Sequence, residues 1–352
     1  MYPIIKKFAD LKHTFIIAEA GSNWKCGTYE EDLEQAKKLI KIASESGADA
    51  VKFQTYKADT VYVESAGNSN YLLKHGIKDN INKIFENLSM PYEMIPELQK
   101  FCQTENIIFM STPFSVKDAK EVDPFVEIHK IASFENNHVR LLEYLAETKK
   151  PIIISTGAST YDEIDFAVNL IKEKGNENIA LLQCTSKYPC SIEALNLSII
   201  PNMNIKYNLP IGLSDHSIDP IIGPIVAVSL GAKIIEKHFT IDRSLPGPDH
   251  PFALNPNELK IMVESVRNAE KSIGNRIKTI VVEEKELRQF AKRAIQAIVD
   301  IKEGDILREG ENFEILRPGG KNRGMEPRYL SSINGKKSKT SIKKGNGIHL
   351  EK

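Results

Sequence analysis

LPIGLSDH (residues 209–216) is an apolar run that ends abruptly in Ser, Asp and His. A second run of the same design, KIIEKHF (residues 233–239), follows soon after it. Alternate side chains of a β-strand share a face, so each His lies on the same face as the polar residue two positions before it. If the two runs are neighbouring strands, each delivers one imidazole, His216 or His238, at its carboxyl end.

This pairing of imidazoles predicts a metal site. A divalent cation requires neutral imidazole or oxygen ligands, and Ser214 and Glu236 share the faces of the two imidazoles. A single such His more often caps a strand or packs in a core, but two at matching strand ends favour a site. We therefore expect His216 and His238 to bind Mn²⁺ or Mg²⁺, and His250 to be a loop residue rather than a third ligand.

The spacing of the apolar runs predicts the fold class. Eight short β-rich runs recur, at 15–20, 50–55, 107–113, 128–133, 151–157, 179–186, 209–216 and 233–239. Most are separated by helix-like segments such as 30–47 and 92–106, which carry apolar residues at helical spacing. Nearly continuous apolar strands are typical of a buried parallel sheet, and eight β–α units are the count of a (β/α)8 TIM barrel. The alternative, a doubly wound open sheet, lacks its G-x-G-x-x-G fingerprint after the first run.

The composition excludes several classes of protein. The chain has 352 residues, and its 47 Lys and Arg residues equal its 47 Asp and Glu residues, so nothing indicates nucleic acid or an anionic membrane. The four cysteines form no C-x-x-C pair, which is typical of a reducing compartment and argues against a structural zinc site. Residues 1–14 contain no long apolar segment of a signal peptide, and no run of about 18 apolar residues predicts a membrane-spanning helix. We expect a cytoplasmic protein.

The chain length suits one large domain and a small one. We place the barrel in residues 1–275, a charged linker in 276–292 and a small β-rich domain in 293–352. Residues 56–91 exceed a normal β–α connection, and we interpret them as an active-site excursion rather than a surface insertion. The last domain repeats the pattern I-K-x-G in 300–307 and 341–348, and it has little core of its own.

Chemistry in such a barrel sits at the carboxyl ends of the strands. Two lysines and several hydroxyl groups converge there, which suits a phosphorylated, anionic substrate. Lys130 has two other interpretations, a surface lysine or a Schiff-base nucleophile, but a phosphate contact is favoured beside the expected metal site. Glu19 is the best acid/base candidate, with a helix-side ion pair as the alternative. The residues expected at this end are Glu19, Lys52, Gln54, Thr112, Lys130, Ser133, Glu135, Ser155, Ser186, Ser214, His216 and His238.

Short motifs, taken in order, resemble those of one family. They are AEAGSN (18–23), GADAVKFQT (47–55), STPF (111–114), KIAS-F-E (130–135), STGA (155–158), GLSDHS (212–217), EKHFT (236–240) and GPDH (247–250). With them the chain resembles the sialic acid synthase family, which includes N-acetylneuraminate, legionaminic acid and pseudaminic acid synthases. The last part, with LRPG at 316–319, resembles the antifreeze-like SAF domain.

The resemblance implies a transferase that condenses phosphoenolpyruvate with an N-acylated amino sugar and water, and releases phosphate. The acceptor is N-acetylmannosamine, giving N-acetylneuraminate, or alternatively a 2,4-diacetamido-2,4,6-trideoxy hexose, as for a legionaminic or pseudaminic acid synthase. The resemblance assigns the acid/base role to Glu19 and metal ligation to His216 and His238. It implies phosphoenolpyruvate contacts at Lys52, Thr112, Lys130, Ser133, Ser155 and Ser214, and sugar contacts at Glu135, Tyr188, Asp249 and Arg317.

The resemblance also implies a domain-swapped homodimer. The small domain of one subunit would cover the barrel of the other, so that Arg317 reaches the N-acyl group of the sugar. Three residues depart from the pattern of sialic acid synthases: Trp24 replaces a His, Phe134 a Gly and Ser186 an Asn. We expect these departures to line the sugar pocket.

The residues disfavour three alternative functions. A condensing enzyme for a phosphorylated aldose is disfavoured by the C-terminal domain, and an aldolase for free pyruvate by the number of phosphate contacts. A non-catalytic sugar- or ice-binding protein is disfavoured because Glu19, both lysines and both histidines are retained.

Overall fold

The computed structural model describes residues 7–68 and 79–349. It divides into two compact units, Met1–Gly274 and Asn275–Lys352. The first six residues, part of the segment judged free of a signal peptide, lie outside the described residues. The expected linker, 276–292, falls in the second unit and contains the helix α12 (Lys285–Ala291).

An eight-stranded parallel sheet forms the centre of the first unit. Hydrogen bonds join its strands in the order β3-β2-β1-β8-β7-β6-β5-β4, and the edge strands β3 and β4 contact each other. The sheet is therefore a nearly closed (β/α)8 barrel, which confirms the fold class predicted for this unit. Each strand coincides with a predicted run. The strands are β1 (Phe15–Gly21), β2 (Ala50–Thr55), β3 (Ile108–Pro113), β4 (His129–Ile131), β5 (Ile152–Ser155), β6 (Ile179–Cys184), β7 (Ile211–Asp215) and β8 (Ile234–His238).

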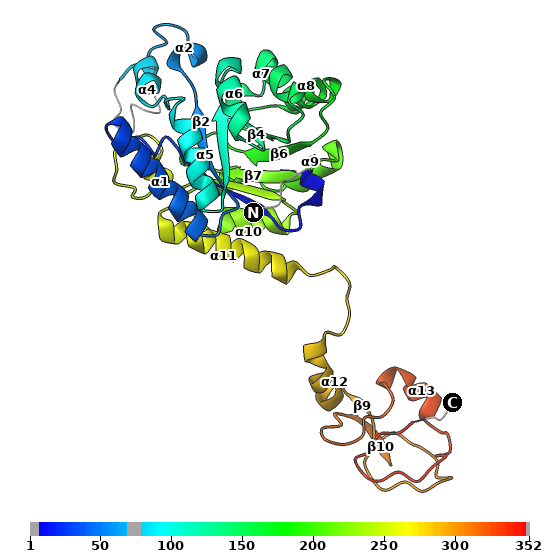
Figure 1. Ribbon diagram of the computed structural model, residues 1–352. Coiled ribbons are helices and arrows are strands. Elements are labelled where there is room, and N and C mark those ends of the chain that lie inside the picture. Colours follow the sequence, from blue (N-terminus) through cyan, green and yellow to red (C-terminus); the bar gives the residue numbers. More distant parts are fainter. Residues whose placement is uncertain (1–6, 69–78, 350–352) are drawn as a thin grey trace. The chain divides into compact units, whose positions relative to one another are not determined.

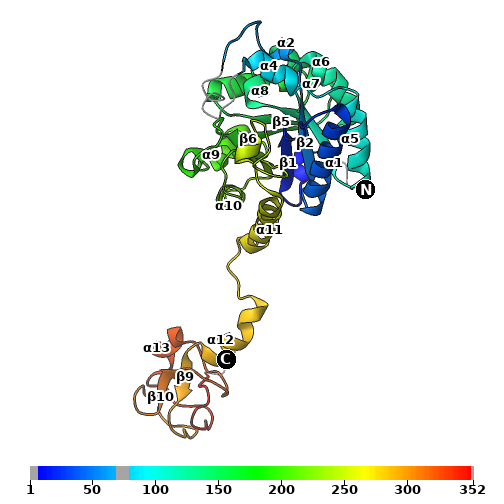
Figure 2. The ribbon, with the colours of Figure 1, turned by 90° about the vertical axis from the view of Figure 1, so that its left-hand side faces the viewer.

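Helices cover the outside of the barrel (Figure 1, Figure 2). The first begins with a capping box, in which Thr28 and Glu31 each accept a hydrogen bond from the other's backbone N–H. The helices predicted at 30–47 and 92–106 are confirmed as α1 and α5. The helices of this unit are α1 (Tyr29–Glu45), α2 (Ala58–Val61), α4 (Ile81–Asn87), α5 (Met94–Thr104), α6 (Val116–Val122), α7 (Val139–Glu147), α8 (Tyr161–Glu173), α9 (Ile199–Tyr207), α10 (Ile222–Ser229) and α11 (Pro256–Ile273). None in 7–68 or 79–274 combines the length and apolar character needed to cross a bilayer.

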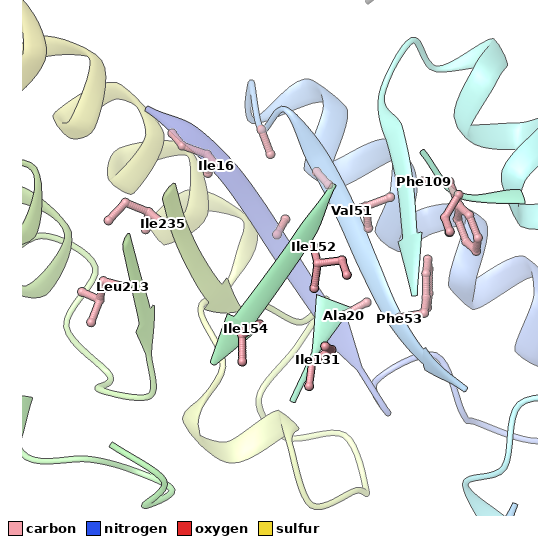
Figure 3. Packing of buried hydrophobic residues seen from close by; sticks show 14 of the residues in the cluster. Ile16, Ala20, Val51, Phe53, Phe109, Ile131, Ile152, Ile154, Leu213 and Ile235 are labelled. Carbon is pink, nitrogen blue, oxygen red and sulfur yellow. The ribbon is translucent and has the colours of Figure 1, made fainter. Parts of the chain in front are cut away.

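Alternate residues of each strand point outward to the helices or inward to the barrel interior. On β1, Ile16 packs outward in the cluster shared with the helices, whereas Ile17 joins a second cluster inside the barrel. Figure 3 shows side chains of the outer cluster on several strands. Gly212 has no room for a side chain, because a Cβ there would lie 2.3 Å from the carbonyl oxygen of Ile234. The next inward position on β1 after Ile17 is Glu19, so the apolar interior ends where the polar carboxyl ends begin.

The excursion after β2 packs through aromatic rings. The ring centroid of Phe85, on α4, lies 4.8 Å from that of Tyr56 and 4.9 Å from that of Tyr62. Both distances are in the range of favourable aromatic pairs, so the rings hold α4 against the end of β2. Residues 69–78 of the predicted excursion lie outside the described residues.

The second unit is a small β-rich domain. Its strands β9 (Ala294–Ala297) and β10 (Phe313–Leu316) are antiparallel, and its short helix is α13 (Leu330–Ile333). The two I-K-x-G repeats pair with each other, because Ile301 and Ile342 exchange two backbone hydrogen bonds of 2.8 Å. Its core consists of Ile295, Ala297, Ile301, Leu307, Phe313, Ile333 and Ile348.

Candidate active site

Inward-facing residues at the carboxyl ends of the strands line a small cavity of about 50 Å³. Several of them gather there because they follow an inner-core residue of the same strand by two positions, as Glu19 follows Ile17 and Glu236 follows Ile234. The cavity brings together Tyr188 and all the residues predicted for catalysis, metal binding and phosphoenolpyruvate. Its lining residues are Glu19, Lys52, Gln54, Thr112, Phe114, Lys130, Ala132, Ser133, Ser155, Cys184, Tyr188, Ser214, His216, Glu236 and His238.

Two buried carboxylates in this cavity have opposite pKa shifts. Burial raises the pKa of Glu19 to about 7, although Lys52 Nζ lies 2.6 Å from its Oε2. Burial also opposes the charge of Glu236, but Lys130 and Lys52 outweigh it and hold the pKa of Glu236 below its ordinary value. Glu19 can therefore exchange a proton near neutral pH while Glu236 stays ionised. Such a pair suits an acid/base group beside a fixed negative charge.

Two ammonium groups face the same space. Lys52 Nζ donates a hydrogen bond of 2.9 Å to Thr112 Oγ1, and Lys130 Nζ donates one of 2.7 Å to Ser155 Oγ. Lys130 is 2% exposed, which excludes its interpretation as a surface lysine. Cations and hydroxyl groups in a cavity shielded from water attract an anion more strongly than they would on the surface.

The two histidines lie side by side, with ring centroids 5.5 Å apart. His216 Nδ1 lies 2.9 Å from the carbonyl oxygen of Thr185. A carbonyl only accepts, so Nδ1 carries the hydrogen and Nε2 keeps its lone pair. Burial holds the pKa of His238 well below its ordinary value, and its Nδ1 has no hydrogen-bond partner among the described residues. Burial opposes a charge on His216, but the contact with Cys184 outweighs it and raises the pKa of His216, so a cation bound there would displace a proton from Nε2. In their neutral forms the two imidazoles each keep a lone pair that fits a divalent cation.

A third amino-acid ligand for such a cation is not apparent. Within 7–68 and 79–349, no group of three or more His, Cys, Asp and Glu residues could hold a metal ion. His250 is buried in a loop, where its Nδ1 lies 2.6 Å from Thr240 Oγ1. A cation bound by His216 and His238 would therefore leave its other positions to water or substrate.

A larger cavity, of about 520 Å³, adjoins the first and shares Gln54 and Tyr188 with it. Tyr188 and Asp249, both predicted sugar contacts, line this cavity. Asp249 Oδ2 accepts two hydrogen bonds of 2.9 Å from the backbone N–H and the hydroxyl of Ser22. The fourth predicted contact, Arg317, is an exposed residue of the second unit and is not among the described residues that line either cavity.

Glu135, the remaining predicted sugar contact, lies in a 3-10 turn (Ser133–Glu135) directly after β4. Burial raises its pKa to about 7, and its Oε2 has no hydrogen-bond partner among the described residues. The pKa of Tyr62, which lines the larger cavity, is raised by burial and further by the nearby charge of Glu135. Glu135 is not among the described residues that line either cavity, but its neighbours Ser133 and Phe134 line the smaller and the larger one.

The prediction that Trp24 lines the sugar pocket is wrong. Trp24 lies in the apolar cluster shared by the strands and helices and is 1% exposed. Its large ring is buried against apolar side chains, so Trp24 contributes to the core rather than to binding of the sugar. The other two departures, Phe134 and Ser186, line the larger cavity as expected.

An ion pair on the opposite face of β7 and β8 supports the two histidines. Lys237 Nζ donates hydrogen bonds of 2.7 Å to Asp215 Oδ2 and 2.6 Å to the carbonyl oxygen of Ser217. Asp215 and Lys237 immediately precede His216 and His238, so their contact joins the ends of the two strands that carry the imidazoles. Gly223 makes room for it, because a Cβ there would lie 2.5 Å from Asp215 Oδ2.

Comparison with known proteins identifies the family. Residues 39–278 match the model of the NeuB family. This chain belongs to the NeuB family. It is 40% identical over 336 residues to the spore coat polysaccharide biosynthesis protein SpsE of Bacillus subtilis strain 168, covering 91% of this chain and 87% of that protein. It is 38% identical over 351 residues to a pseudaminic acid synthase of Campylobacter jejuni, covering 98% of each chain.

A solved sialic acid synthetase has a similar fold. The crystal structure of N-acetylneuraminic acid (sialic acid) synthetase from Leptospira borgpetersenii, in complex with citrate, matches with a TM-score of 0.69 and 33% identity. The match covers 79% of this chain and 91% of that one. The predicted resemblance to sialic acid synthases is thereby confirmed, and the chain is an enzyme of this NeuB family. Its similarity to a SAF domain stays a prediction.

The sequence placed Glu236 on the same face of its strand as His238, but it did not predict the ionic contacts of Glu236. The structure puts its carboxylate 3.7 Å from Lys52 and 3.8 Å from Lys130.

Residues of the excursion after β2, among them Tyr62 and Phe85, line the larger cavity, which agrees with the interpretation of 56–91 as an active-site excursion. The sequence did not predict which of its residues face the cavity, because the segment has no periodic pattern.

Proposed function

We propose that this protein is a nonulosonic acid synthase, which condenses phosphoenolpyruvate with an N-acylated amino sugar and releases inorganic phosphate. The observation that carries the proposal is the cavity where Lys52 and Lys130 meet Glu19 and Glu236. Two buried ammonium groups with neighbouring hydroxyls suit the phosphate and carboxylate of that substrate. Membership of the NeuB family supports the same conclusion.

A phosphate-release assay with phosphoenolpyruvate and a panel of N-acylated amino sugars tests this proposal. We expect release with at least one acceptor, and none when the sugar is omitted. If phosphate were released with a phosphorylated aldose but with none of the amino sugars, the protein would catalyse a different condensation. We also propose a cytoplasmic location, which the four free cysteine thiols support.

The proposed reaction uses the chain's groups in three steps. The methylene carbon of phosphoenolpyruvate attacks the aldehyde carbon of the open-chain sugar, and water then adds to the electron-poor C2. One proton of this water passes to Glu19 and from there to the sugar alkoxide, which becomes a hydroxyl group and leaves Glu19 ionised again. The tetrahedral intermediate collapses to a C2 carbonyl, and the second water proton leaves with phosphate, whose charge Lys52 and Lys130 stabilise.

We further propose that His216 and His238 bind one divalent cation, Mn²⁺ or Mg²⁺. Such a cation supplies Lewis-acid polarisation of the sugar aldehyde when it is bound. His216→Ala and His238→Ala should each weaken Mn²⁺ binding to the chelated protein by at least about 10-fold and lower activity, because one of two protein ligands is lost. Calorimetry measures the binding, with His13→Ala as the control, since that side chain is 52% exposed and pairs with Asp49. Unchanged Mn²⁺ affinity in both variants would show that His216 and His238 do not form the metal site.

We also propose that the active form is a domain-swapped homodimer, with the second unit of one subunit over the barrel of its partner. Exposed apolar side chains in the second unit, Val282, Leu287 and Phe290 among them, support its docking on another surface. In this arrangement the planar donors of Arg317 suit the carbonyl of the sugar's N-acyl group.

Arg317→Ala should raise the KM for the sugar by about 10-fold or more, because the loss of one hydrogen bond from a charged donor weakens binding by about that factor. The KM for phosphoenolpyruvate should change little. Arg308→Ala, an exposed Arg of the same unit, is the matched control. Mixing Arg317→Ala chains with Glu19→Gln chains should restore activity, because one site of each heterodimer receives both intact residues. No recovery after demonstrated subunit exchange would rule out the swapped site.

A further inference from the structure

We infer that Glu236 is a positioning residue, whose carboxylate is the fixed counter-ion that keeps the buried side chain of Lys130 charged. The inference rests on the proposed function and adds to it a residue to which none of the proposed steps gives a role. It predicts that loss of this carboxylate weakens the binding of phosphoenolpyruvate at alkaline pH, although the carboxylate itself repels that anion.

Glu236 and the two lysines form the floor of the smaller cavity. Each of the three follows a residue of the apolar interior by two positions on its own strand, as Glu236 follows Ile234 and Lys130 follows Ile128. Their strands, β2, β4 and β8, are alternate strands of the barrel, which contribute side chains to the same layer. None of the three side chains is more than 7% exposed, so their charges act on one another through the protein interior rather than through water.

One oxygen of Glu236 faces both lysines. Its Oε1 lies 3.7 Å from Lys52 Nζ and 3.8 Å from Lys130 Nζ. Both distances are longer than a hydrogen bond, so the carboxylate balances the charges without taking an N–H group from either lysine. Lys130 Nζ donates to the carbonyl oxygen of Ile131 and to Ser155 Oγ, which leaves its third N–H without a partner among the described residues. That group is available to an incoming anion.

Lys130 depends on Glu236 more than Lys52 does. Among residues 7–68 and 79–349, Lys130 forms an ion pair with Glu236 alone, whereas Lys52 Nζ also lies 2.6 Å from Glu19 Oε2. Burial lowers the pKa of Lys130 even with Glu236 in place, and a buried ammonium group without a partner gives up its proton. A neutral Lys130 would attract an anion less, and its lone pair would make it a nucleophile toward a carbonyl carbon.

Simple repulsion predicts a result of the opposite sign. Glu236 faces an anion site, so its replacement by a neutral residue would strengthen the binding of phosphoenolpyruvate at every pH if the carboxylate only repelled the ligand. The role as counter-ion predicts equal or stronger binding only where Lys130 keeps its proton, and weaker binding where the proton is lost. The pH dependence of binding therefore separates the two.

The test is calorimetric titration of the full-length protein with phosphoenolpyruvate from acid to alkaline pH. The measured quantity is the Kd of Glu236→Gln divided by that of the wild type, a ratio in which the ionisation of the ligand cancels. We expect a ratio near or below one at acid pH that rises by about 10-fold or more toward alkaline pH, because one hydrogen bond from a charged donor is lost. Glu236→Asp retains the charge, so its ratio should change little with pH.

A double variant identifies the group that titrates. Glu236→Gln with Lys130→Met should bind phosphoenolpyruvate weakly at every pH, with a Kd that Glu236→Gln alone approaches at alkaline pH. This comparison is needed because other titratable groups face Lys130 or line its cavity, and all of them remain in both variants. They are Glu19, Lys52, Glu135, Cys184, Tyr188, His216 and His238.

The control is Glu143→Gln, which removes a carboxylate that pairs with Arg140 and Lys174 on the outside of the barrel and should leave the Kd unchanged. Circular dichroism verifies that each variant is folded. If the ratio for Glu236→Gln does not change with pH, or if the double variant shows the same rise, this inference is overturned while the proposed function stands. If the wild type neither binds phosphoenolpyruvate nor releases phosphate from it, the proposed function is overturned first.

Discussion

Glu19→Gln should lower kcat by about 10²–10⁴-fold, the range expected when a general base is lost. The substitution keeps the shape of the side chain and one acceptor oxygen for Lys52 Nζ, while its new NH2 group requires the Gln54 amide to turn and accept instead of donate. It cannot take a proton from water. Binding of phosphoenolpyruvate should change little, because both lysines remain. Single-turnover measurements at saturating substrates separate the chemical step from product release.

The pH profile gives an independent test of this role. Burial raises the pKa of Glu19 to about 7, and a base acts only when deprotonated, so kcat should fall about tenfold per pH unit as the pH drops below 7. The residual rate of Glu19→Gln should lack this decline. The control is Glu135→Gln, since Glu135 is also buried with a pKa of about 7 but has no proton to transfer in the proposed reaction. If Glu135→Gln rather than Glu19→Gln removed the decline, the assignment of the base would be wrong.

The barrel was predictable because its signal is local. Each strand alternates between an outward layer and an inward one, so the apolar runs and their polar ends gave the strands and the end that carries the chemistry. The same alternation predicts that Glu19, Lys52 and His238 lie at one end of the barrel, and in the structure they line one cavity. The helix inside the expected linker, α12, was missed because its charged residues resemble those of an unstructured connection.

What the sequence could not provide were properties that depend on packing between distant segments. Trp24 lies three residues after β1, near the motif AEAGSN, yet its ring packs in the core. The charge state of Glu236 depends on Lys52 and Lys130, which come from β2 and β4. The aromatic lining of the larger cavity is likewise formed when α4 returns to Tyr56, a contact that no periodic pattern specifies.

Lys237→Met should lower the free energy of unfolding by about 3–5 kcal/mol, since it leaves the carboxylate of Asp215 buried without its partner. Burial lowers the pKa of Lys237, so its charge depends on Asp215, and neither side chain is more than 1% exposed. Urea unfolding followed by circular dichroism measures the loss. An exposed lysine, as in Lys278→Met, serves as the control and should change stability by less than about 0.5 kcal/mol.

The double variant Lys237→Met with Asp215→Leu separates the cost of an unpaired charge from the value of the pair. Replacing both partners removes the buried charge, so most of the lost stability should return. If the pair acts mainly by positioning His216 and His238, the double variant should be stable and still bind Mn²⁺ more weakly than the wild type. A Lys237→Met variant as stable as the wild type would mean that Asp215 takes up a proton or reaches water. Full Mn²⁺ affinity in the double variant would mean that β7 and β8 hold the imidazoles without the pair.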